Sequence, residues 1–355
     1  MFIGAYYYLW YGRPTLPIIG GGIWRWGYAN KPLLGEYNSR DEKVIGRHIA
    51  WAKKARIDFF VINWSDMGSW DDITLKDYFL KHEKISDIKF CLQYDTTLSL
   101  NRFKAFHSFD LEDKYSATLT KGAKLLEDFE YLAENYFNHP QYFKIDGKPV
   151  VIIYAASGLR HVPYYFDQLV KNMAKRGIRL YLVADAVCWA GIKISKRNLI
   201  SLWRMPPEQM FKVVFRAFGR LFPQKYEEDI SLGKYFKGIT AYNLYDPNRL
   251  AGFPEKVDNL YQKFFNYANS NNLTFLPNIM PGYDDRKIMD EKSPVLERKN
   301  GEFYRQFGKI AKKYINDKNA ALLITTFNEW HEGTEIEPSK EHGETYLELT
   351  KALKS

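Results

Sequence analysis

The stretch EKVIGRHIAWAKKARIDFFVINW, residues 42–64, determines which fold this chain can adopt. Its first part, Glu42–Ala55, has apolar residues at helical spacing, at Val44, Ile45, Ile49 and Ala52. Its last part, Asp58–Trp64, is continuously apolar rather than alternating, which is typical of a parallel strand covered on both faces. The stretch therefore predicts a helix that leads into a buried parallel strand.

The same alternation of apolar runs and helical stretches continues in both directions. Seven further strands are predicted at Phe2–Trp10, Ile88–Tyr94, Lys148–Tyr154, Arg179–Asp185, Phe236–Tyr242, Leu273–Ile279 and Ala321–Phe327. Helices are predicted at Leu75–Lys84, Ala117–Tyr136, Tyr164–Arg176, Val257–Ser270, Phe303–Asn316 and Tyr346–Lys354. This order allows a doubly wound sheet or a closed barrel. Eight strands in 355 residues favour an α/β fold with a single (β/α)8 TIM-type barrel, one catalytic domain over residues 1–355.

Composition excludes several classes of protein. No apolar run reaches the roughly 18 residues that a membrane-spanning helix needs. The first residues lack the cationic region and cleavage site of a signal peptide. Cys91 and Cys188 form neither a metal-binding spacing nor a disulfide framework. We therefore expect reduced thiols and a cytoplasmic protein, or a secreted or periplasmic one if a signal was trimmed.

Polar and aromatic residues gather where each predicted strand ends, which is where barrel enzymes place their chemistry. Aromatic rings flanked by amides and carboxylates suit a sugar, because its C–H faces pack on rings and its hydroxyls need acceptors and donors. Any one of these rings could instead belong to the core. The predicted substrate-binding residues are Tyr7, Tyr8, Trp10, Tyr11, Trp64, Gln93, Tyr94, Tyr154, Tyr242, Tyr283, Asp284, Asn328, Trp330 and His331.

The motif FNEWHEGTEIEP, Phe327–Pro338, supplies the candidate catalytic residues Glu329 and Glu332. Cleavage of a glycosidic bond normally needs one neutral and one ionised carboxyl group. Two crowded carboxylates reach these two states because each raises the cost of ionising the other. The competing interpretation is a solvated acidic loop. Glu335 and Glu337 are less favoured as catalytic residues, since Glu337 precedes Pro338 and is expected in a structural role, and Glu335 is expected to be solvated.

No cofactor and no metal are predicted. His331 lies in E-W-H-E rather than the zinc motif H-E-x-x-H. Gly20-Gly21-Gly22 lacks the spacing and the following helix of a dinucleotide-binding loop.

Four blocks of the chain resemble glycoside hydrolase family 99 and the family-99-like proteins of bacterial polysaccharide loci. A further segment, KIDGKPVVIIY, is more similar to the family-99-like proteins than to family 99 itself. The blocks are YYYLWYGRP at residues 6–14, PLLGEYNSRDEKVIGRH at 32–48, PGYDD at 281–285 and FNEWHEGTEIEP at 327–338. The resemblance implies a (β/α)8 barrel and endo-acting, retaining hydrolysis of α-mannosides. It also implies that Glu329 acts as base toward the substrate's own 2-hydroxyl and Glu332 as acid/base, through a 1,2-anhydro sugar. Substrate-assisted routes of this kind are exceptions to the two-carboxylate scheme.

Positive charge gathers in residues 193–225, which hold eight basic residues and one acid within the predicted insertion 190–232. Phe211, Val214, Phe215, Phe218 and Phe222 follow helical spacing there. The segment is interpreted as a surface helix, as a wall for an anionic glycan, or as a weak contact with an anionic membrane surface. Nucleic acid is not expected, since no binding motif accompanies the charge.

Glycan hydrolysis is the function that the sequence favours, with an oligosaccharide or polysaccharide as substrate. A glycosyltransferase or accessory enzyme of surface-polysaccharide (O-antigen or capsule) synthesis is the first alternative. The chain lacks the D-x-D-type metal–diphosphate site that would support this alternative, since Asp71-Asp72 and Asp284-Asp285 are adjacent pairs. A non-catalytic glycan-binding barrel is the second.

Overall fold

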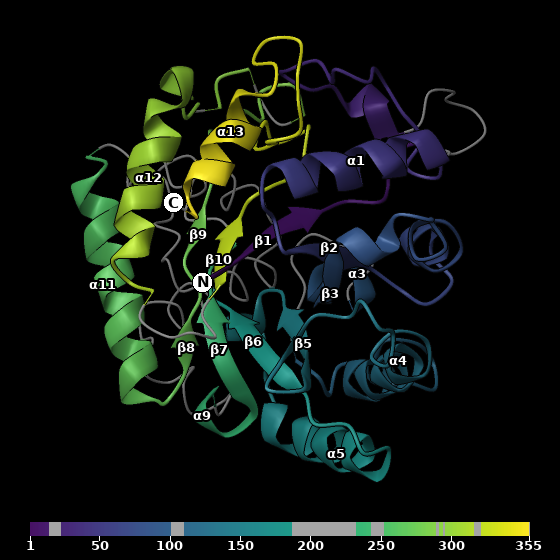
Figure 1. Cartoon of the computed structure of the whole chain (residues 1–355). Helices are drawn as coiled ribbons and strands as arrows, with labels where there is room; N and C mark the ends of the chain where they lie inside the picture. The colour runs from purple at the N-terminus through teal and green to yellow at the C-terminus, as the bar shows by residue number, and fades with distance from the viewer. Residues whose placement is uncertain are drawn as a thin grey trace, which may run out of the picture.

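The computed structural model describes residues 1–13, 23–100, 110–186, 232–242, 252–288, 291–293, 295–315 and 321–354. A ring of parallel strands lies at the centre and helices surround it (Figure 1). The strands are β1 Phe2–Tyr7, β2 Phe59–Trp64, β3 Lys89–Tyr94, β4 Lys144–Ile145, β5 Lys148–Ile153, β6 Tyr181–Asp185, β7 Phe236–Thr240, β8 Thr274–Phe275, β9 Asn278–Ile279 and β10 Ala321–Ile324.

The sheet closes on itself through one extended segment. Its order is β8-β7-β6-β5-β3-β2-β1-β10-β9, and the small strand β4 pairs antiparallel with β5. β8 and β9 are two halves of the segment Thr274–Ile279. Between them, the N–H of Leu276 donates to Ile239 on one side and the carbonyl of Pro277 accepts from Leu323 on the other. The predicted (β/α)8 barrel is therefore confirmed.

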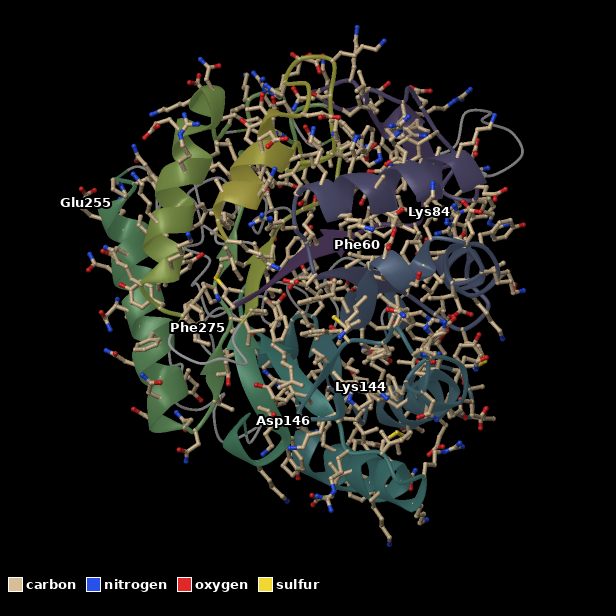
Figure 2. The ribbon with its side chains drawn as sticks, in the orientation of Figure 1. Phe60, Lys84, Lys144, Asp146, Glu255 and Phe275 are labelled. Atoms are coloured by element: carbon tan, nitrogen blue, oxygen red, sulfur yellow. The ribbon has the colours of Figure 1, made fainter. Side chains whose placement is uncertain are left out.

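The helices form the outer layer. They are α1 Glu42–Lys54, α2 Trp70–Thr74, α3 Thr96–Ser99, α4 Lys121–Asn135, α5 Val162–Lys175, α9 Leu232–Tyr235, α11 Glu255–Ser270, α12 Glu302–Lys312 and α13 Thr345–Ala352. Short 3-10 turns lie at Ile23–Trp26, Ile85–Asp87, Ala156–Gly158 and Lys299–Gly301, and a π turn lies at Leu75–Phe79. Charged side chains such as Lys84 and Glu255 lie at the rim, while Phe60 and Phe275 lie inside (Figure 2).

Helix α1 shows how the sequence produces this layer. The side chain of Asp41 accepts a hydrogen bond from the backbone N–H of Lys43 and so caps the first turn. The predicted apolar stripe is buried along the whole helix, as Ile49 and Ala52 are fully covered. Two lysines lie in the last turn, where the helix dipole favours positive charge.

Two predicted elements end earlier than expected. The first strand stops at Tyr7 because the next backbone N–H, on Tyr8, donates to the side chain of Asn328 and not to a neighbouring strand. The helix expected at Leu75–Lys84 is wrong in its bounds. It begins at Trp70, where Ser69 caps the first turn, and becomes the π turn that ends at Phe79.

The predicted insertion, residues 190–232, lies outside the described residues except for its last one, and so does Cys188. Among the residues that the structure does describe, no helix has the length and apolar character needed to cross a membrane.

Gly4 on β1 leaves no room for a side chain. A Cβ atom at this position would lie 2.4 Å from the ring of Phe59 and 3.0 Å from Leu323. We predict that Gly4→Ala lowers the free energy of unfolding by about 1–3 kcal/mol, because overpacked cores lose roughly this much. Urea denaturation measures the change. Gly233→Ala is the control, since its Cβ would meet only ordinary contacts. Equal stability of the two variants would contradict the packing argument.

Candidate active site

The carboxyl ends of the strands form a polar layer inside the barrel. Successive side chains of a strand face opposite sides, so residues two apart share the inner face. The ring of Tyr242 lies 4.8 Å from that of Tyr6 on β1 and 5.8 Å from that of Tyr154 after β5. Neither strand is a neighbour of β7, so these rings meet across the interior. The predicted residues Tyr154 and Tyr242 therefore face the barrel axis, and the strand register places Gln93 on the same face.

Three of the predicted substrate-binding residues face the helices instead: Tyr7, Trp64 and Tyr94. The Tyr7 hydroxyl contacts Nδ1 of His48 on α1 at 2.9 Å. Trp64 donates its indole N–H to Asp72 on α2, and Tyr94 donates its hydroxyl to Asp128 on α4, both at 2.8 Å. These side chains attach the helices to the barrel and lie away from the interior.

The segment after β10 is held to the end of β1 by a reciprocal pair of hydrogen bonds. The Tyr8 N–H donates to Oδ1 of Asn328 at 2.8 Å, and Nδ2 of Asn328 donates to the Tyr8 carbonyl at 2.9 Å. The Tyr11 hydroxyl donates to the carbonyl of Asn328 and accepts from the N–H of Trp330. Asn328, Tyr11 and Trp330 therefore fix the backbone that carries Glu329.

Glu337 is the centre of a buried polar cluster under this segment. Its Oε2 accepts hydrogen bonds from the Tyr37 hydroxyl at 2.8 Å and from the Trp330 indole at 3.1 Å. Its Oε1 lies 3.1 Å from Nε2 of His48, which in turn contacts Tyr7. Glu337 thus has the structural role that the sequence suggested. The cluster joins β1, α1 and the segment after β10.

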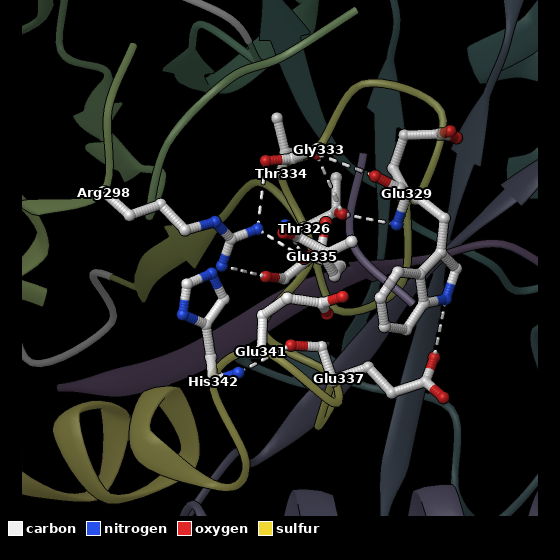
Figure 3. A network of polar contacts seen from close by, with 12 residues as sticks. Arg298, Thr326, Glu329, Gly333, Thr334, Glu335, Glu337, Glu341 and His342 are labelled. Carbon is white, nitrogen blue, oxygen red and sulfur yellow. Dashed lines mark hydrogen bonds and ion pairs between the residues drawn. The ribbon is translucent and has the colours of Figure 1, made fainter. Parts of the chain in front are cut away.

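A buried ion pair closes the same segment from the other side (Figure 3). Arg298 donates to the carbonyls of Gly333 and Glu335 and pairs with Oε1 of Glu335 at 2.6 Å. Asn30 donates to the same oxygen. The expectation of a solvated Glu335 is therefore wrong, because this carboxylate is buried. Burial still raises the pKa of Glu335 to about 7, although Arg298 opposes the shift.

The two candidate catalytic carboxylates lie on this fixed backbone. Glu329 is buried, and its Oε1 accepts a hydrogen bond from the N–H of His331 at 3.0 Å. Glu332 is half-buried, and its carbonyl accepts from the N–H of Asp284 at 2.7 Å. The whole of Glu329 is therefore enclosed, while part of the Glu332 residue reaches solvent.

The protonation states of the pair are coupled. Burial raises the pKa of Glu329 well above its usual range, and the nearby charge of Glu332 raises it further. Burial, with the charge of Asp285, raises the pKa of Glu332 to about 7. Near neutral pH the pair therefore retains protons that free glutamates would lose, and a proton-transfer pair needs a carboxyl that is still protonated.

Two tyrosines connect the pair to the barrel wall. The Tyr8 hydroxyl donates to that of Tyr242 at 2.6 Å, and the Tyr242 hydroxyl donates to Oε2 of Glu332 at 3.5 Å. Trp10 stacks on Tyr8 with ring centroids 4.3 Å apart. Of the predicted residues, Tyr8, Trp10 and Tyr242 thus gather beside Glu332.

The remaining predicted residues lie at the edges of this group. His331 places Nδ1 2.8 Å from the carbonyl of Gly27, and its buried Nε2 has no partner among the described residues. Tyr283 donates to Asp285 at 3.1 Å. Asp284 forms an ion pair with Arg286 at 2.7 Å, which lowers the pKa of this carboxyl group.

Sequence reasoning missed several polar residues, among them Asn63, Asp71, Asp95 and Arg298. At the end of the second strand it selected Trp64, although the inner face carries Asn63. The signal that could have found Asn63 was the two-residue period, once one inward residue of each strand was known. Arg298 lay in no recognisable motif.

One group of described side chains could share a metal ion: Asp110, Glu112 and His161. Nδ1 of His161 lies 2.7 Å from Oδ1 of Asp110, which is an ordinary contact for an exposed ion pair. This group lies apart from Glu329 and Glu332 in the contacts that the structure records.

Comparison with known proteins agrees with this geometry. The family model described as "Glycosyltransferase WbsX" matches residues 30–350, and the chain belongs to this family. The chain is 24% identical to glycoprotein endo-alpha-1,2-mannosidase of Mus musculus over 98% of its own length and 70% of that protein. It is also 24% identical to the human endo-alpha-1,2-mannosidase-like protein, over 97% and 70%.

Solved structures share the fold. A family 99 endo-alpha-mannosidase from Bacteroides thetaiotaomicron superimposes with a TM-score of 0.67 at 20% identity, covering 99% of this chain and 95% of that one. A glycoside hydrolase-like protein gives a TM-score of 0.72 at 20% identity, with 99% and 93% covered. The predicted resemblance to the family-99-like proteins is therefore confirmed.

The buried cluster around Glu337 yields a first prediction for this site. Glu337→Gln replaces an acceptor oxygen by an NH2 donor opposite donors from Tyr37 and Trp330. We expect the free energy of unfolding to fall by about 1–3 kcal/mol, the usual cost of unsatisfied buried polar groups. Urea denaturation measures it, with the exposed Glu297→Gln as control. A loss no larger than that of the control would show that the cluster does not hold the segment.

The raised pKa of Glu332 yields a second prediction for this site. A carboxyl whose folded-state pKa is raised contributes stability that is present below its unfolded pKa and lost as pH rises through about 7. Glutamine carries no titrating proton, so Glu332→Gln should gain stability relative to the wild type between pH 4 and pH 8, by roughly 1–3 kcal/mol. Unfolding curves across this range test it. A difference that stays constant with pH would refute the raised pKa.

Proposed function

We propose that this chain is a retaining glycoside hydrolase that cleaves an α-linked, manno-configured glycan within the chain of sugars. The carrying observation is the coupled pair Glu329 and Glu332, fixed beside Tyr8 and Tyr242 at the carboxyl end of β10. The relatives named as endo-alpha-1,2-mannosidases support the sugar and the mode of cleavage.

The reaction uses the substrate's own 2-hydroxyl as nucleophile. Glu329 takes the proton of this hydroxyl while the hydroxyl oxygen attacks C1, and the bond from C1 to the leaving oxygen breaks. Glu332 donates its proton to that oxygen, and a 1,2-anhydro sugar remains. Water then attacks C1 and gives a proton to Glu332, while Glu329 returns its proton to the 2-oxygen. Two displacements at C1 retain the anomeric configuration.

Hydrogen bonds act on each carboxylate of the pair. The N–H of His331 donates to Glu329 and opposes the burial that raises its pKa, which favours the anion that must accept a proton. Glu332 has a pKa of about 7, so it can hold a proton near neutral pH and give it to the leaving oxygen. Tyr242 donates to Glu332 and orients its carboxylate.

Transfer to a sugar hydroxyl is the second candidate function, and the description of the family model as a glycosyltransferase favours it. The same two carboxylates serve both reactions, since the anhydro sugar can react with water or with another sugar. The choice depends on which acceptor reaches C1. Product analysis with and without an added oligosaccharide acceptor separates the two outcomes.

The catalytic assignment is tested with two isosteric variants. We predict that Glu329→Gln and Glu332→Gln each lower kcat on an α-linked mannan oligosaccharide at least 1000-fold, because each removes one of the two proton transfers. Reducing-end assays measure turnover, and NMR of the first product reports its anomer.

The exposed Glu297→Gln serves as the matched control and should keep full turnover. Full activity in either site variant would remove the assignment, and an inverted first product would remove the anhydro-sugar route. Circular dichroism of both variants checks that the fold is retained.

A further inference from the structure

Positive charge gathers at the end of the barrel opposite the candidate active site. The strands β1, β2, β3, β5, β6, β7 and β10 run parallel, so the chain enters all of them at one end. The ion pair between Lys354 and Asp58, at 2.6 Å, shows that the last helix also ends there, because Asp58 precedes β2. We call this end the amino face, and it comprises residues 53–58, 81–89, 136–148, 175–179, 233–237, 270–273, 312–315 and 351–354.

The charge of the amino face is strongly one-sided. Its segments hold seventeen lysine and arginine residues but four aspartate and glutamate residues. The resulting net charge of +13 exceeds the +9 of the whole chain, so the remaining residues are acidic on balance. The carboxyl groups of Glu329 and Glu332 belong to the opposite end of the barrel. An anionic partner would therefore be attracted to the amino face.

Neighbouring carboxylates neutralise only part of this charge. Arg176 pairs with Glu134 at 2.8 Å, and Lys313 pairs with Asp258 at 2.7 Å. Nine other cations of the amino face form no ion pair with the residues that the structure describes. Each of them is exposed or half-buried, and they are Arg56, Lys89, Lys144, Lys148, Lys175, Arg179, Lys237, Lys312 and Lys351.

The dipoles of the helices explain some of these cations but not all. The carboxyl end of a helix favours positive charge, and Lys175 and Lys312 are the last residues of α5 and α12. Lys89 and Lys144 are instead the first residues of β3 and β4, and Lys237 is the second residue of β7. A helix dipole acts within the last turn of its helix, so it gives no reason for positive charge at these three positions.

The arrangement of the unpaired cations indicates the shape of a partner. They lie where the chain enters β2, β3, β5, β6, β7 and β10, which are distributed around the barrel. Neighbouring strands are about 4.8 Å apart, so a small anion can contact the cations of one or two strands. A broad anionic surface can approach all of them together. A bilayer that contains anionic lipids has this shape, and it attracts exposed lysine and arginine side chains.

We propose that the amino face is a docking surface for an anionic lipid bilayer. Binding is peripheral and electrostatic, through the unpaired lysines and arginines. The candidate active site lies at the carboxyl ends of the strands, so it faces away from the lipid and stays open to a glycan. The proposal holds whichever reaction that site performs. Salt weakens the binding, because the charges are exposed and ions screen them beyond about 10 Å at 0.1 M ionic strength.

The test is co-sedimentation of the full-length chain with lipid vesicles at low and at high sodium chloride. One set mixes phosphatidylglycerol with phosphatidylcholine, and the other contains phosphatidylcholine alone. The parent chain should bind the mixed vesicles at low salt only, and should not bind phosphatidylcholine. Each lysine or arginine near an anionic surface strengthens binding roughly fivefold, so losing four should lower the partition coefficient roughly 100-fold or more. The face variant carries four changes at exposed, unpaired positions: Lys89→Gln, Lys144→Gln, Arg179→Gln and Lys237→Gln.

The matched control loses the same charge at the carboxyl end of the barrel. It also carries four changes at exposed positions: Arg25→Gln, Lys31→Gln, Lys287→Gln and Lys340→Gln. Its partition coefficient should stay within roughly threefold of the parent, because these side chains lie more than a screening length from the lipid. Thermal melts of both variants should match the parent, since all eight positions are exposed.

Four outcomes would overturn the proposal. The first is that the parent fails to bind the mixed vesicles at low salt. The second is that the face variant binds like the parent, which would assign binding to another part of the chain. The third is an equal loss in both variants, which would show that net charge alone attracts the chain. The fourth is binding to soluble dextran sulfate without binding to vesicles, which would indicate an acidic glycan as the partner.

Discussion

The closed parallel barrel imposes one constraint on which every functional placement in this chain depends. Each strand sends successive side chains alternately toward the axis and toward the helices. Closure through Thr274–Ile279 joins β7 to β10, so the inward set is enclosed by the other strands. The inward set becomes polar at the carboxyl ends, at Asn63, Gln93 and Tyr242. The outward set stays aromatic and ties the helices on.

The segment after β10 is the second part of the structure on which the site depends. It carries both catalytic candidates and has no regular secondary structure. Its backbone is held by side chains: Asn328 pairs with Tyr8, Glu337 collects three donors, and Arg298 closes the turn at Gly333. Irregular backbone is costly to bury unless its polar groups are satisfied. Here those hydrogen bonds also set the position of Glu329.

The same enclosure produces the chemistry. A carboxyl group in water ionises below pH 5, and two of them would both be charged at neutral pH. Burial raises both pKa values; the charge of Glu332 adds to the shift at Glu329, and the charge of Asp285 adds to the shift at Glu332, so the pair stays partly protonated at neutral pH. The Tyr8–Tyr242 pair then supplies a hydrogen bond to Glu332 without adding charge. The family described as glycosyltransferases and the family 99 endo-alpha-mannosidase share this barrel fold.

The sequence by itself determined the order of strands and helices, the barrel and the motif Phe327–Pro338, because the spacing of apolar residues and the length of apolar runs are local properties. It also singled out Glu329 and Glu332 as catalytic candidates, since they follow the predicted strand Ala321–Phe327. It could not tell which alternate residues of each strand face the barrel interior, so Tyr7, Trp64 and Tyr94 were predicted to bind substrate although they face the helices. Only the tertiary structure decided which residues face inward, because the orientation of a strand follows from its pairing with strands that are distant in the sequence. The buried partners of Arg298 and Asp71 were decided in the same way, by contacts that no local pattern records.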